Sequence, residues 1–148
     1  MNNIKSALIL AAFSLSAHAG PVMLVTQQEM LDSLHAPPQY TPKFVPEKDA
    51  PKIDVAAPNL AAPVASPTPI QLNFAATAPA TIKPETFKVL YGAFQIDITQ
   101  RLLSATKVTA LGMNVQEASL PSGKHKLHLS VEDSMGRKGY RLVEFQIN

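Results

Sequence analysis

From residue 51 to residue 148, apolar and polar residues alternate with a period of two. In residues 70–74, for example, Ile70, Leu72 and Phe74 are separated by Gln71 and Asn73. Successive side chains of a strand point to opposite faces, so this period places one face in a core and the other in water. The runs are 53–55, 70–74, 87–91, 94–98, 127–131 and 143–147, with proline or glycine turn signals between them. The pattern predicts half-buried strands.

Two further segments complete the predicted body of the protein. A weaker strand is expected within 107–120, around Val108 or Val115. Residues 98–104 are expected to form a single helical turn, because the adjacent Leu102 and Leu103 cannot both face inward in a strand. About seven short strands without a long helix favour an all-β fold, an antiparallel β-sandwich spanning 51–148.

Residues 20–50 are predicted to be a short amphipathic helix followed by a proline-rich linker. Thr26 and Glu29 have the spacing of a capping box, and Met30, Leu31 and Leu34 follow on one helical face. A helix this short is not stable alone in water. Either the apolar stripe docks on a partner protein, or the segment is disordered or packs loosely on its own domain.

Residues 1–19 have the three parts of a secretory signal peptide. Lys5 supplies the positive charge, residues 7–15 form a short apolar run, and 17–19 read Ala-His-Ala, the small-x-small pattern of a cleavage site. The apolar run is shorter than the roughly 20 residues that span a bilayer. We therefore expect an exported protein, in the periplasm or outside the cell, that does not span the membrane.

The composition excludes several classes of function. The 148 residues include no cysteine, which excludes disulfides, thiolate metal sites and a cysteine nucleophile. A formal net charge of +2 is too small for a nucleic-acid-binding surface. Outward cations of the last two strands form either an ordinary solvated face or a patch for an acidic partner or anionic polymer: Lys124, Lys126, Arg137 and Lys138.

No arrangement of residues indicates catalysis, a metal or a cofactor. His125 and His128 are three apart in a predicted strand and so point to opposite faces, which prevents joint metal ligation. Glu132 and Asp133 offer fewer oxygens than calcium requires, and Asp133 is expected to accept N–H groups of the turn that follows it. No serine lies in a nucleophile motif. We therefore expect a protein that is not an enzyme.

The C-terminal stretch resembles the last hairpin of bacterial immunoglobulin-like (Ig-like) domains. The turn Leu-Pro-Ser-Gly-Lys-His at 120–125 leads into an alternating strand, an Asp-x-x-Gly turn follows at 133–136, and the chain nears its end with Phe-Gln-Ile at 145–147. The segments at 51–55 and 69–74 also resemble the first two strands of such domains. The resemblance implies an Ig-like sandwich over 51–148 and specifies no activity.

These observations predict a periplasmic, non-enzymatic Ig-like module that binds another envelope protein or belongs to a larger assembly. The contact is expected to use Met30, Leu31 and Leu34 or the cations Lys124, Lys126, Arg137 and Lys138, or an open sheet edge. The alternative is a module that binds carbohydrate or another cell-envelope polymer. It ranks second because the chain has no Trp and only 3 Tyr to offer as aromatic platforms.

Overall fold

A computed structural model describes residues 20–38 and 44–148, so the predicted signal peptide at 1–19 lies outside the described residues. These described residues contain ten elements: β1 (Val22–Met23), α1 (Gln27–His35), β2 (Lys52–Ala57), β3 (Thr68–Ala75), β4 (Ile82–Tyr91), β5 (Ile96–Asp97), α2 (Thr99–Leu103), β6 (Gly112–Ser119), β7 (Gly123–Asp133) and β8 (Lys138–Ile147).

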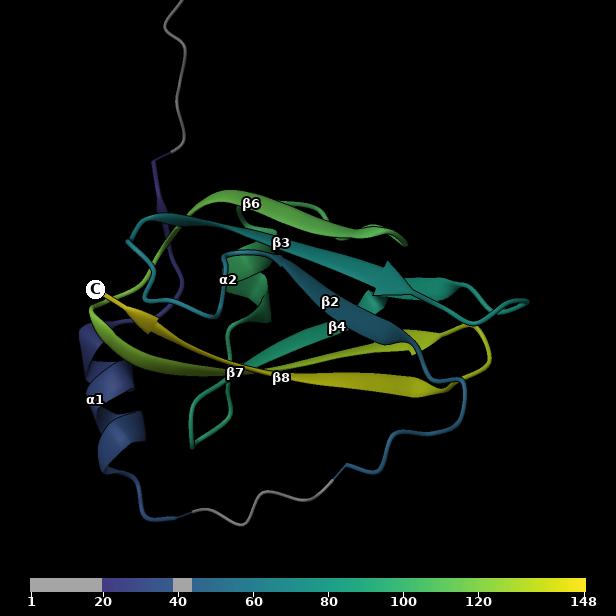
Figure 1. The fold of residues 1–148 in the computed structure, drawn as a ribbon, viewed down its shortest axis with the longest axis horizontal. Coiled ribbons are helices and arrows are strands. Elements are labelled where there is room, and N and C mark those ends of the chain that lie inside the picture. Colours follow the sequence, from purple (N-terminus) through teal and green to yellow (C-terminus); the bar gives the residue numbers. More distant parts are fainter. Residues whose placement is uncertain (1–19, 39–43) are drawn as a thin grey trace, which may run out of the picture.

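The strands form two sheets of four that face each other across one core (Figure 1). Sheet A has the order β1-β6-β3-β2 and sheet B the order β5-β4-β7-β8. All neighbours are antiparallel except β1, which runs parallel to β6. The prediction of an all-β, predominantly antiparallel fold is confirmed.

The core lies on the faces of the strands that the period-two pattern of the sequence predicts to be buried. In β3 buried and exposed residues alternate without exception, and in β7 every second residue from His125 onward is buried. The core between the sheets is built from aliphatic and phenylalanine side chains of both, such as Leu72 and Phe74 from β3, Phe87 and Val89 from β4, and Val131 from β7.

Three local predictions have different outcomes. The run at 94–98 is mostly a turn, because Gly92 and Gln95 have positive φ angles of 65° and 50°, which leaves only β5 as strand. The helical turn is confirmed as α2, with Leu102 buried and Leu103 38% exposed. The weaker strand is β6, which contains Val115 but not Val108.

Residues 22–35 pack against the sandwich, which is closest to the predicted alternative that the segment packs on its own domain. The predicted capping box is present: Thr26 Oγ1 accepts from Glu29 N, and a Glu29 carboxylate oxygen accepts from Thr26 N. The helix ends at His35, because Ala36 precedes a proline and is extended. The segment folds onto the body because Leu24, Val25 and Met30 fill the end of the core.

Candidate partner-binding surface

A bidentate ion pair joins α1 to the sandwich. Arg101 of α2 donates to both carboxylate oxygens of Glu29, at 2.8 and 2.7 Å, and also to the carbonyl of Leu24 at 2.9 Å. The hydrogen bonds from Arg101 lower the pKa of Glu29 to about 2. Asp97, four residues before Arg101 in the chain, accepts the N–H of Thr99 at the start of α2.

The predicted apolar stripe of α1 is largely used by this docking. Met30 is 5% exposed and belongs to the core, and Leu31 is half-buried against it. Leu34 is 52% exposed. Of the three residues proposed as a partner contact, Leu34 alone presents most of its side chain to the surface.

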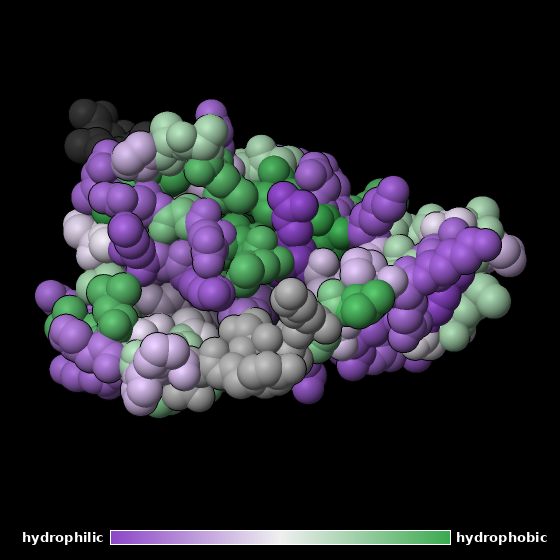
Figure 2. Space-filling view, turned by 60° about the horizontal axis from the view of Figure 1, so that its bottom comes forward, coloured by the Kyte–Doolittle hydropathy of each residue, from purple (hydrophilic) through white to green (hydrophobic). Residues whose placement is uncertain are grey.

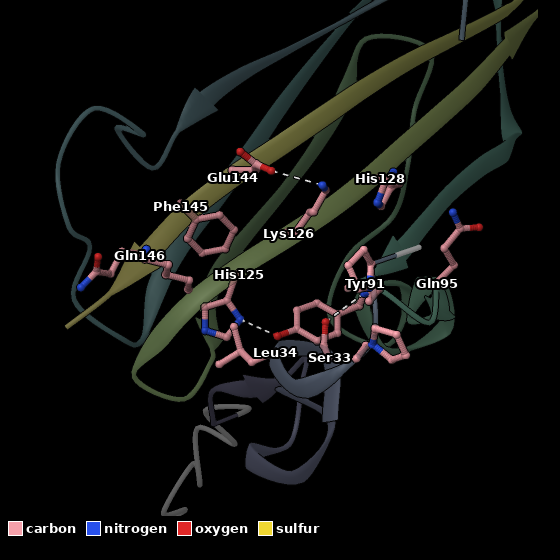
Figure 3. A pocket seen from close by; sticks show the side chains of 16 residues that line it. Ser33, Leu34, Tyr91, Gln95, His125, Lys126, His128, Glu144, Phe145 and Gln146 are labelled. Atoms are coloured by element: carbon pink, nitrogen blue, oxygen red, sulfur yellow. Dashed lines mark hydrogen bonds and ion pairs between the residues drawn. The ribbon is translucent and has the colours of Figure 1, made fainter. Parts of the chain in front are cut away.

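A groove of about 660 Å³ lies between the C-terminal end of α1 and sheet B (Figure 3). One wall is α1 with Ala36, Pro37 and Pro38, and the other is formed by the β4–β5 turn and the outward side chains of β7 and β8. Ser33 Oγ accepts the N–H of Ala93 at 2.9 Å. The helix approaches so closely that a Cβ on Gly92 would lie 2.2 Å from Ser33 Oγ.

The floor of the groove includes the neighbouring rings of Tyr91, the buried His125 and Phe145. The Nε2 of His125 donates to the carbonyl of Pro121 at 2.8 Å, which leaves Nδ1 to accept from the Tyr91 hydroxyl at 3.0 Å. Burial lowers the pKa of His125, and burial, with a smaller contribution from the charge of Glu29, raises the pKa of Tyr91 to about 12. Both ring nitrogens are engaged by groups of the fold, and burial favours the neutral form of His125.

The structure does not bring the four predicted cations together. Lys124 and Lys126 lie at the start of β7, and Arg137 and Lys138 lie at the opposite end of the β7–β8 hairpin. Three of them have carboxylate partners: Lys126 with Glu144 (3.3 Å), Arg137 with Asp133 (2.7 Å) and Lys138 with Glu132 (3.1 Å). The predicted basic residues are therefore spread over the hairpin and mostly neutralised.

Asp133 has the turn-forming role that the sequence predicted. It is fully buried, and one of its oxygens accepts the N–H groups of Met135 and Arg137 at 2.9 and 3.0 Å. Although burial alone would raise the pKa of its carboxyl, these hydrogen bonds and those from the Arg137 side chain hold that pKa below its usual value. Within residues 20–38 and 44–148 no cluster of His, Asp or Glu is suited to hold a metal ion.

The outer face of β8 carries exposed apolar side chains that the prediction of contact residues missed. Tyr140 is 42% and Leu142 48% exposed, and the ring of Phe44 stacks on Tyr140 with centroids 4.1 Å apart. Figure 2, which brings the lower side of Figure 1 forward, shows hydrophobic side chains gathered among hydrophilic ones. In the sequence, the alternation of residues 142–147 already places Leu142 on the outward side of its strand, and this pattern could have identified it as a contact residue.

The comparisons with known proteins add no further constraint. No family model matches the chain, and neither a curated protein nor a solved structure matches it. Among the helices that the structure describes, none is long and apolar enough to cross a membrane.

Proposed function

We propose that this chain is an exported, non-enzymatic Ig-like module that binds another protein of the cell envelope through the outer face of sheet B. The observation that carries the proposal is the exposed apolar surface of β8, with Tyr140, Leu142 and the stacked Phe44. Exposed aromatic and aliphatic side chains that lie together favour a protein partner. The groove beside Leu34 opens on the same sheet and extends the contact surface.

The order of the strands supports an Ig-like sandwich. The chain forms β2 and β3 in sheet A, crosses to β4 and β5 in sheet B, returns to β6, and ends with β7 and β8 in sheet B. An Ig-type sandwich likewise places its first two strands with the fifth, and its third strand with the last two. The parallel strand β1 is an addition to that plan.

A protein partner fits the charges of this face better than an anionic polymer does. Lys126, Arg137 and Lys138 each have a carboxylate within 4 Å, so little uncompensated positive charge is left to attract a polyanion. The carbohydrate alternative ranks second for a related reason. Tyr91 is 1% exposed and Tyr140 is stacked with Phe44, so neither offers a free ring; Tyr40 lies outside the described residues.

The site of contact can be tested by photo-crosslinking in cells that express the full-length chain. A photoreactive amino acid replaces Leu142 on sheet B or, as the matched control, the exposed Gln71 on the outer face of sheet A. We expect a specific adduct with an envelope protein from position 142 and none from position 71. Equal adducts from both positions, or none from either, would overturn the proposal.

Export is tested separately by cell fractionation of the same full-length chain. We expect a product shortened by about 19 residues in the periplasmic fraction or the medium. A product of unchanged length that stays in the cytoplasm would contradict export, whatever the crosslinking shows.

A further inference from the structure

The edge of sheet B at β8 has backbone groups that face away from the sheet. Within the described residues, β8 is the last strand of sheet B on this side (Figure 1). In β7 the carbonyl of Lys126 accepts from Gly92 and so points toward β4. The backbone groups of the next residue, Leu127, therefore point the other way, toward its partner Val143 in β8, and those of Val143 point toward Leu127. Alternate residues of β8, namely Tyr140, Leu142 and Glu144, therefore direct their N–H and C=O groups outward.

The same chain already uses the far end of this edge as a strand-pairing site. Val64 N donates to the carbonyl of Gln146 at 2.8 Å, and Asn148 N donates to the carbonyl of Val64 at 2.9 Å. Val64 thus pairs with Ile147 as a parallel bridge. At the other end Pro51 lies against Gly139, where an added Cβ would be 2.0 Å from the Pro51 carbonyl oxygen.

Between these two ends the edge is open. Among residues 20–38 and 44–148, no hydrogen bond reaches the outward backbone groups of Tyr140, Leu142 or Glu144. A cleft of about 620 Å³ lies between residues 138–141 of β8 and an opposite wall formed mainly by residues within 44–54, which include the start of β2. Arg141 lies two residues before the buried Val143, so its side chain is on the inward side of β8. It is nevertheless exposed, as expected where no other side chains of the described residues pack at this corner of the sandwich.

We propose that the edge of β8 from Tyr140 to Glu144 binds a short extended segment of the partner protein, which joins sheet B as an additional strand. The inference rests on the proposed function and specifies how the partner is held. Main-chain hydrogen bonds to the outward groups supply the affinity, and side chains at alternate positions of the guest strand supply the specificity. Proline is excluded at the guest positions that donate to the edge.

The side chains beside the edge specify the chemistry of the guest segment. On the outer face, Tyr140 and Leu142 favour apolar guest residues. On the side of the cleft, Arg141 has no carboxylate partner within the described part of the chain, unlike Lys126 and Lys138 on the same hairpin. An Asp or Glu of the guest strand would pair with it.

A second copy of this chain fits the edge poorly. If two β8 strands paired in antiparallel fashion about Leu142, Lys138 of one copy would lie opposite Gln146 of the other. The outward carbonyl of Gln146 is already bonded to Val64, which occupies the place that the second strand needs. The short open stretch suits a free extended segment instead.

The probe for the test is a capped peptide of about eight residues, a common strand length, with alternating Val and Thr and one Asp on the side that faces Arg141. Its control has the same sequence with N-methyl groups on the amides that face β8, which removes the donors. Binding to the processed chain is followed by amide chemical shifts and hydrogen exchange. We expect shifts and slower exchange at Tyr140, Leu142 and Glu144, and binding about tenfold weaker for the N-methylated peptide.

Two variants test the protein side of the contact. Leu142→Pro removes one outward donor at an edge position that tolerates proline, and we expect it to weaken peptide binding about tenfold. Leu142→Ala keeps the donor and is expected to bind more tightly than Leu142→Pro. The N-methylated peptide keeps the inference testable if Leu142→Pro fails to fold.

Four outcomes would overturn the inference: no binding, equal binding of the two peptides, shifts confined to the groove beside α1, or a dimer of the chain that Leu142→Pro dissociates. The photo-crosslinked partner separates this inference from the proposed function. If that partner binds the Leu142→Pro variant as well as the wild type, strand addition is wrong while the partner-binding function stands.

Discussion

At the scale of single residues, His125 makes the stability of the fold depend on pH. Its pKa is lowered mainly by burial, so the unfolded chain binds a proton more readily than the folded chain does. The contribution of the neutral His125 to stability is therefore complete above the pKa of the unfolded chain, about 6.5, and is lost as the pH falls below that value. Protonation also places a hydrogen on Nδ1, which then no longer accepts from Tyr91.

We expect the free energy of unfolding, measured with urea, to fall between pH 7 and pH 5. In His125→Gln that fall should be much smaller, because the titrating group is gone. His128, whose pKa is also lowered by burial, contributes to the same window, so His128→Asn is the matched comparison. An unchanged pH dependence in His125→Gln would show that the buried imidazole is not the group responsible.

At the scale of elements, α1 depends on a contact that is remote in sequence. Glu29 and Arg101 are separated by 72 positions and meet in a partly exposed pair. Glu29→Gln removes the charge and, because solvent screens the pair, is expected to cost about 1–2 kcal/mol. Amides of α1 should exchange faster in hydrogen-exchange measurements, whereas those of β7 should change little.

Asp32→Asn is the control for this prediction, since the exposed Asp32 lies on the same helix and accepts a hydrogen bond from the exposed Gln28. It should change stability by less than about 0.5 kcal/mol. Acid should have the effect of Glu29→Gln: the pKa of Glu29 is lowered to about 2, so its stabilisation is complete above pH 4.5 and is lost between pH 4.5 and pH 2. Unchanged exchange in α1 would contradict the role of the ion pair.

Some elements of this structure could be predicted from the sequence, and others could not. Local patterns predicted local structure: the capping box of Thr26 and Glu29 marked the start of α1, and alternation marked β3 and β7 residue by residue. Where α1 docks was not predictable, because it depends on pairs such as Ser33 with Ala93 that are far apart in the chain. The open edge of β8 was not predictable either, because it depends on which strands become neighbours.

At the scale of the whole molecule, we expect β1 and the turn into α1 to unfold together with the sandwich. Leu24 and Val25 are 0% and 1% exposed and lie in the core with residues of both sheets. Burying a leucine side chain of this kind contributes about 1.5–3 kcal/mol. A segment that carries two such residues cannot detach without opening the end of the core to water.

The adjacent residues Met23 and Leu24 allow a matched test of that unity. Met23 is 62% exposed and Leu24 is fully buried. Leu24→Ala should destabilise the fold by about 2–4 kcal/mol, and Met23→Ala by less than about 0.5 kcal/mol. Because unfolding of a domain this small is expected to be cooperative, the loss should appear as one shifted transition in the strand signal of circular dichroism. If Leu24→Ala only released α1 and left that transition in place, the N-terminal segment would be an accessory arm and not part of the fold.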